Sequence, residues 1–102
     1  MSSYDKLAIQ LLAFLKIYNT TNAEYSEVFM SLIPEIAIDN ITLFIEALNP
    51  LGYDVRKRTI GELENISDKE TVRKLIIDLD KIKNPNLNKT IKQVREFLLN
   101  LQ

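Results

Sequence analysis

The sequence predicts an all-α protein, a compact bundle of about five helices that ends in an antiparallel helical hairpin. Three observations predict this class. Only two Gly and three Pro occur in 102 residues, too few for the many tight turns of an all-β domain. A Ser or Thr followed three residues later by an acid, the capping-box pattern of helix starts, begins at Ser2, Thr21, Thr59 and Ser67. Apolar residues also recur at helical spacing along much of the chain.

Composition predicts one globular domain spanning residues 1–102. The chain is 46% apolar and 26% charged, which is typical of a packed domain rather than a disordered tail. Its longest apolar stretch is too short and too interrupted for a membrane span or a targeting signal. Cys is absent, so no disulfide can form, as is usual for proteins of the cytoplasm. We therefore expect a cytoplasmic domain stabilised by packing alone.

The first expected helix, over residues 4–18, is apolar almost all round. Leu11 and Leu15 belong to one face, whereas Ile9 and Ile17 lie outside that face. Such a helix is either central in the bundle or covered by another chain, because solvating its second face would expose a large apolar patch.

The middle of the chain predicts two more helices and a loop. One helix is expected over residues 23–32, ending near Pro34. The next lies within residues 35–48, and either Asp39 caps it or Pro34 opens it. Residues 51–59 have turn character and are expected to be a loop.

Two amphipathic stripes predict the closing hairpin. Asn84 followed by Pro85 marks a helix start, since Asn caps and Pro loses no needed N–H in the first turn. The short connection around these residues predicts that the two helices fold back on each other. The stripes consist of Val72, Leu75, Ile76, Leu79 and Ile82, then of Leu87, Ile91, Val94, Leu98 and Leu101.

The lack of His and Cys removes the side chains that perform most acid-base, nucleophilic and transition-metal chemistry near neutral pH. Paired acids such as Asp78 with Asp80 are two residues apart, so on a helix they point to different faces. We expect no enzymatic activity, no metal site, no cofactor and no small-molecule ligand.

Charge is distributed unevenly along the chain. Residues 1–51 hold six acids and two bases, whereas residues 52–102 hold eleven bases and eight acids. Basic side chains concentrate in the expected loop before Thr59 and on the outer face of the last expected helix. Near that helix, Asn86, Asn88 and Gln93 add side-chain amides able to contact nucleic-acid bases. The basic side chains are either ordinary solvated charges or phosphate contacts. The candidate nucleic-acid contacts are Arg56, Lys57, Arg58, Lys89, Lys92 and Arg95.

Two apolar residues lie on the wrong sides of the hairpin helices. Ile77 is about 140° from the apolar stripe of its helix, and Leu99 points toward the basic face of the last helix. Coverage by the rest of the chain is the simpler explanation for Ile77, and a partner interface is the better one for Leu99. The candidate protein interface therefore comprises Ile9, Ile17 and Leu99.

Residues 75–101 resemble a short helical family of unknown function that is often encoded beside formate dehydrogenases. The matching features are an apolar helix, Asn84 with Pro85, and a second helix ending in a Leu-rich turn at Leu98 and Leu101. The chain departs from that family at Lys89 to Lys92, where the family has Gly and small apolar residues. The resemblance implies a small accessory protein of a larger complex and carries over no functional residues.

These features together predict a non-catalytic helical protein-interaction module, either an accessory or adaptor subunit of a larger complex or a homo-oligomer. The alternative is a small nucleic-acid-binding protein or regulator that uses the basic residues. A further alternative is an inhibitor of a host complex, encoded by a virus or plasmid. No membrane partner is expected.

Overall fold

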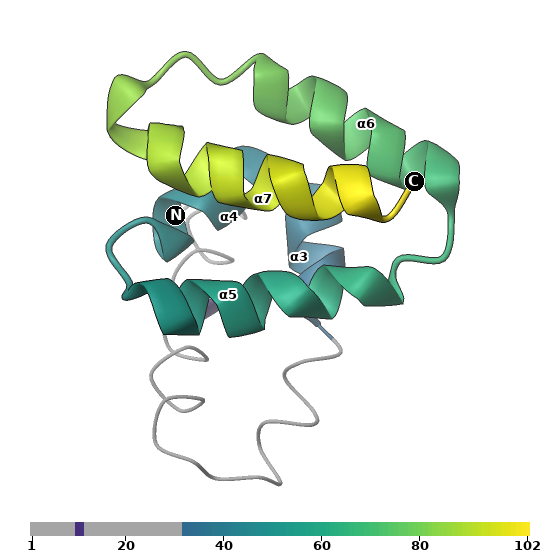
Figure 1. Ribbon diagram of the computed structural model, residues 1–102, viewed down its shortest axis with the longest axis horizontal. Coiled ribbons are helices and arrows are strands. Elements are labelled where there is room, and N and C mark those ends of the chain that lie inside the picture. The colour runs from purple at the N-terminus through teal and green to yellow at the C-terminus, as the bar shows by residue number, and fades with distance from the viewer. Residues whose placement is uncertain (1–9, 12–31) are drawn as a thin grey trace, which may run out of the picture.

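Helices form all the regular structure in the part of the chain that the computed structural model describes, residues 10–11 and 32–102 (Figure 1). No strand occurs there, and the predicted all-α class is confirmed. Every helix in that part is too short or too polar to traverse a lipid bilayer. The elements are α3 (Ile33–Asp39), α4 (Ile41–Leu48), α5 (Tyr53–Gly61), the 3-10 helix η1 (Glu62–Asn65), α6 (Lys69–Asp80), the 3-10 helix η2 (Pro85–Leu87) and α7 (Asn88–Asn100).

The first two expected helices lie almost wholly outside the described residues. Of the helix expected over 4–18, only Gln10 and Leu11 are described; both are helical, and Leu11 is completely buried in the core. The candidate interface residues Ile9 and Ile17 are outside the described range.

A single residue, Asn40, separates α3 from α4. Pro34 lies in the first turn of α3, where its missing N–H costs nothing. Asn40 has an extended backbone, and its side-chain oxygen accepts a hydrogen bond from the Leu43 N–H at 3.2 Å. Pro34 therefore opens a helix, as one of the two sequence alternatives proposed. Asp39 is the last residue of α3, and the cap of the next helix is Asn40 instead.

The predicted loop over residues 51–59 is wrong, because α5 occupies most of it. This helix begins at Tyr53, after Gly52 in extended backbone. Thr59 was expected to start a helix but lies inside α5, where its hydroxyl donates a hydrogen bond to the Val55 carbonyl at 2.8 Å. Thr59 and Ile60 are buried, so packing against the core holds a helix whose sequence is otherwise mostly polar.

The start of α6 differs from the expected cap by one residue. Asp68, rather than Ser67, accepts hydrogen bonds from the Glu70 N–H at 3.1 Å and the Thr71 hydroxyl at 2.8 Å. Before α7, Asn84 accepts from the Asn86 N–H at 3.0 Å, as the Asn-Pro motif predicted, although the motif opens η2.

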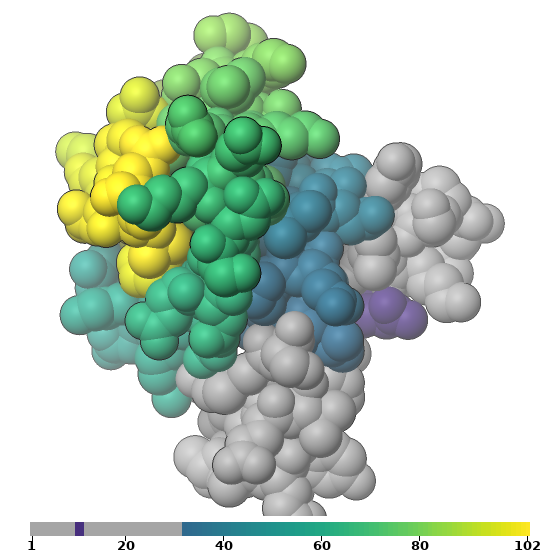
Figure 2. Space-filling view, turned by 90° about the vertical axis from the view of Figure 1, so that its right-hand side faces the viewer, coloured from purple at the N-terminus to yellow at the C-terminus, as the bar shows by residue number. Residues whose placement is uncertain are grey.

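The core lies where α4, α6 and α7 meet, with α5 and η1 closing it on another side (Figure 1). α6 packs on α7 and on α4, and η1 packs on α3. Figure 2 shows the green residues that follow α5 directly against the blue residues of α3 and α4. The antiparallel hairpin stays a prediction. The buried apolar residues are Leu11, Ile33, Ala37, Ile41, Phe44, Ile45, Ala47, Leu48, Ile60, Leu63, Val72, Leu75, Ile76, Leu79, Leu87, Val94 and Leu98.

Candidate protein-interaction surfaces

Arg56, a predicted phosphate contact, serves the fold instead. It is only 7% exposed and lies on α5. Its Nε donates a hydrogen bond to the Gln93 side-chain oxygen of α7 at 2.9 Å, and an Nη atom donates to the Leu51 carbonyl. The Tyr53 ring lies beneath the guanidinium, 5.9 Å from ring centre to carbon. Arg56 therefore ties the α4–α5 connection to α7, and it engages the side-chain oxygen of Gln93, a residue expected to contact nucleic-acid bases.

The other two members of this basic run are exposed but diverge. Lys57 and Arg58 follow Arg56 on a helix, where successive side chains are about 100° apart. Three consecutive bases on a helix therefore face three directions. The compact basic loop expected over residues 56–58 does not exist.

The basic residues of the last helix are only partly available. Lys89 and Lys92 are exposed on α7. Arg95 donates from Nε to Asp80 Oδ1 of α6 at 3.0 Å, with both side chains about half exposed. Such an exposed pair contributes about 0.2–1 kcal/mol to stability, and it links the outer faces of α6 and α7.

Ile77 and Leu99 are exposed on the outside of α6 and α7. Leu99 is 42% exposed, in agreement with its predicted position outside the apolar stripe. Ile77 is 56% exposed, so the described part of the chain does not cover it as expected. Ile77 precedes Asp80 by three residues and Leu99 follows Arg95 by four, so each aliphatic lies about one turn from the ion pair between the helices.

Bases predominate around these two aliphatics. The four residues that lie three or four positions from Ile77 are all exposed, and three of the four are basic. They are Arg73, Lys74 and the acidic Asp80 on α6, and Lys81 just after it. Beside Leu99, Arg95 and the acidic Glu96 hold the equivalent positions and are also exposed. The α6–α7 surface, defined by Ile77, Leu99 and these charged neighbours, thus combines an apolar centre with a mainly basic surround.

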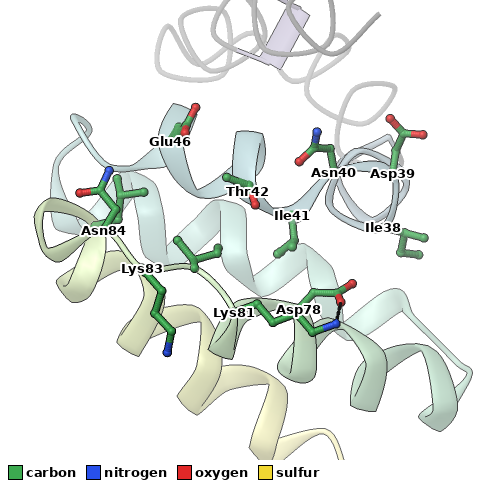
Figure 3. A pocket seen from close by; sticks show the side chains of 12 residues that line it. Ile38, Asp39, Asn40, Ile41, Thr42, Glu46, Asp78, Lys81, Lys83 and Asn84 are labelled. Atoms are coloured by element: carbon green, nitrogen blue, oxygen red, sulfur yellow. Dashed lines mark ion pairs between the residues drawn. The ribbon is translucent and has the colours of Figure 1, made fainter.

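A hollow of about 500 Å³ opens at another place, between the α3–α4 joint and the connection that follows α6 (Figure 3). No sequence signal pointed to it, because its two sides are some forty residues apart in the chain. Among its lining residues, Ile38 is 49% exposed. The hollow is lined by Ile38, Asp39, Asn40, Ile41, Thr42, Glu46, Asp78, Lys81, Ile82, Lys83, Asn84 and Leu87.

Opposite charges line the two sides of the hollow. Figure 3 shows the carboxylates of Asp39 and Glu46 on the α3–α4 side and the Lys83 ammonium on the opposite side. Lys81 also lies on the latter side, with its Nζ 3.9 Å from an Asp78 oxygen. Apolar residues such as Ile41 lie between the two charged bands.

Two carboxyl groups elsewhere have perturbed acidities. Hydrogen bonds from the Thr71 hydroxyl and the Glu70 N–H lower the pKa of Asp68, because they stabilise its charged form. Partial burial, and then the charge of Glu64, raise the pKa of Glu62. Both effects belong to helix ends and lie outside the α6–α7 surface and the hollow.

Within residues 10–11 and 32–102, no three acidic side chains converge where they could hold a metal ion. Comparison of the chain with protein-family models, with curated proteins and with solved structures finds no match. The resemblance of residues 75–101 to the family encoded beside formate dehydrogenases therefore stays a prediction.

Proposed function

We propose that this protein is a non-catalytic, cytoplasmic protein-binding module, an accessory subunit that docks on a larger assembly through its α6–α7 surface. One observation carries the proposal: Ile77 and Leu99 are 56% and 42% exposed, whereas the preceding residues Ile76 and Leu98 are buried in the core. Core packing therefore does not explain why positions 77 and 99 are aliphatic.

Burial of these aliphatics would supply the driving force for docking. Covering an exposed Leu or Ile side chain fully is worth about 1.5–3 kcal/mol, and these two are roughly half exposed. The exposed bases around them, Arg73, Lys74 and Lys81, favour a partner whose apolar patch is surrounded by acids.

The same geometry argues against nucleic acid as the partner. Arg56 is buried and engaged with Gln93 and Leu51, and Arg95 is paired with Asp80. Duplex binding needs several basic side chains in an unbroken array, whereas those of the α6–α7 surface surround exposed aliphatics and are interrupted by the acids Asp80 and Glu96. We therefore propose a protein partner, and the absence of His and Cys supports a role without catalysis.

Site-specific photocrosslinking in cells of the source organism tests this proposal. A photoreactive phenylalanine analogue at position 77 or 99 should capture a discrete partner, because both side chains would lie in the interface. The same analogue in place of Lys57, exposed on α5, is the control and should capture nothing discrete. The captured protein also distinguishes a cellular assembly from a host complex inhibited by a viral or plasmid protein.

A substitution that disrupts the proposed interface completes the test. Ile77→Asp in the chain that carries the crosslinker at position 99 should abolish capture, because a charge would enter the apolar centre. Equal capture at all three positions, or capture that persists with Ile77→Asp, would contradict the proposal.

A further inference from the structure

The hollow beside Asn40 presents a three-part pattern: acids, apolar side chains, bases. Asp39 and Glu46 form the acidic band, and Lys81 and Lys83, with the acidic Asp78 beside Lys81, form the mainly basic band. Ile41 lies between them, and the half-exposed Ile38 lies beside Asp39 at one end of the hollow (Figure 3). Figure 3 shows the Asp39 and Glu46 carboxylates and the Lys83 ammonium directed away from one another. A small-molecule site needs polar groups that converge on the ligand, and these diverge.

Within residues 10–11 and 32–102, most of these charged side chains have no partner. The side chains of Asp39, Glu46 and Lys83 form neither a hydrogen bond nor an ion pair there. Asp39 is also the final residue of α3, where a negative charge lies next to the negative end of the helix dipole. Lys81 has only the long 3.9 Å pair with Asp78, which is exposed to solvent.

The charge separation extends beyond the hollow. Residues 32–52, which contain α3 and α4, hold the acids Glu35, Asp39 and Glu46 and no base. Residues 69–102, which contain α6 and α7, hold eight bases and four acids, a net charge of +4. The hollow therefore lies on the border between an acidic and a basic part of the molecule.

We propose that this hollow binds the same hollow of a second copy of the chain, forming a two-fold symmetric dimer. A two-fold axis that runs along the apolar strip, parallel to the two bands, places the acidic band of each copy opposite the basic band of the other. The same axis keeps Ile38 of both copies at the same end of the interface. This surface shares Lys81 with the edge of the α6–α7 surface but contains neither Ile77 nor Leu99. Substitutions of those two residues therefore distinguish this proposal from the proposed docking of a partner.

The charges of the hollow are complementary to those of a second, rotated copy, which favours self-association over binding of another partner. A partner of uniform charge would be attracted to one band and repelled by the other. A second copy in the two-fold orientation instead satisfies both bands at once, with the same pairs formed twice.

Charge reversal with complementation tests the dimer by sedimentation velocity over a range of concentrations. The acidic-band variant is Asp39→Lys with Glu46→Lys, and the basic-band variant is Lys81→Glu with Lys83→Glu. Each alone should dimerise at least about tenfold more weakly than the unmodified chain, because like charges would then face each other. An equimolar mixture should recover dimerisation, because in the mixed dimer every facing pair is again opposite in sign.

The matched controls are Glu35→Lys on α3 and Lys89→Glu on α7, exposed charges outside the hollow, which should leave dimerisation unchanged. Circular dichroism and thermal unfolding should show that all variants fold. An unmodified chain that is monomeric at every concentration would overturn the proposal, as would a dimer indifferent to both variants or a mixture that fails to recover. Ile77→Asp and Leu99→Asp should leave the dimer intact, which separates this test from that of the proposed function.

Discussion

The inner and outer faces of α6 and α7 carry the same kinds of residue with opposite roles. Leu98 is completely buried and Leu99, the next residue, is 42% exposed; Ile76 is 8% exposed and Ile77 is 56% exposed. One step along a helix, about 100°, separates the members of each pair. The inner member is explained by the core. The outer member contributes little to the core, and the proposed docking surface accounts for its presence.

The largest expected effect on stability comes from a substitution on the buried inner face of α7. Leu98→Ala should lower the free energy of unfolding by about 2–5 kcal/mol, because it removes buried contacts and leaves a cavity. Leu99→Ala should change it by less than about 0.5 kcal/mol, as is usual for a surface substitution. Denaturant unfolding of the two variants measures the contrast. Similar losses for both would show that Leu99 belongs to the core and would weaken the proposed function.

A second contrast compares a buried base with its exposed neighbour. Arg56→Met should lower the free energy of unfolding by about 1–3 kcal/mol, because the Gln93 and Leu51 oxygens lose their donors in a partly buried place. Lys57→Met, one residue further and exposed, should be nearly neutral. Thermal unfolding under identical conditions compares them. If the Lys57 variant is the less stable, Arg56 does not have the structural role assigned to it.

A third contrast concerns threonines. The buried Thr90 hydroxyl of α7 donates to the Asn49 side-chain oxygen, just after α4, at 2.7 Å. Thr90→Val keeps the shape and removes this donor, so it should lower the free energy of unfolding by about 1 kcal/mol. Thr42→Val, exposed on α4, is the control and should cost less. Equal effects in chemical denaturation would mean that the α4–α7 hydrogen bond adds nothing to stability.

The smallest expected effect is pH dependence at the α6 start. The pKa of Asp68 is lower in the folded protein than its ordinary value of 3.8. Its contribution is therefore complete at neutral pH and is lost as the pH falls below that ordinary value and through the lower folded-state pKa. Asp68→Asn should flatten the acid limb of a stability-against-pH curve relative to the parent chain. An unchanged acid limb would exclude Asp68 as a contributor.

Much of the fold could be predicted from local sequence, because strong amphipathic periodicity survives any tertiary arrangement. Val72, Leu75 and Leu79 were expected in the core and are buried there. The helix α5 escaped prediction, because its polar composition and basic run are typical of a loop. The spacing of Val55, Thr59 and Ile60 was the available signal, since these residues share one face of the helix.

The candidate surfaces were less predictable, because they depend on what covers a side chain. Helical spacing placed Leu99 outside the apolar stripe correctly, yet the same spacing could not tell whether another segment covers Ile77. The hollow joins Ile38 and Lys83 from distant parts of the chain, and only the packing of α4 on α6 brings them together. Burial of Arg56 likewise depends on Gln93, which lies 37 residues away.

The one-residue link at Asn40 has a mechanical consequence. With α3 ending at Asp39 and α4 starting at Ile41, no spacer can absorb a change in the angle between the two helices. A tilt of α3 would move Asp39, whereas α4 would stay in place because its Phe44 and Ile45 are buried in the core. The angle between α3 and α4 therefore sets the distance between Asp39 on α3 and Glu46 on α4, so replacing Asn40 would change the spacing of the two acids at the hollow.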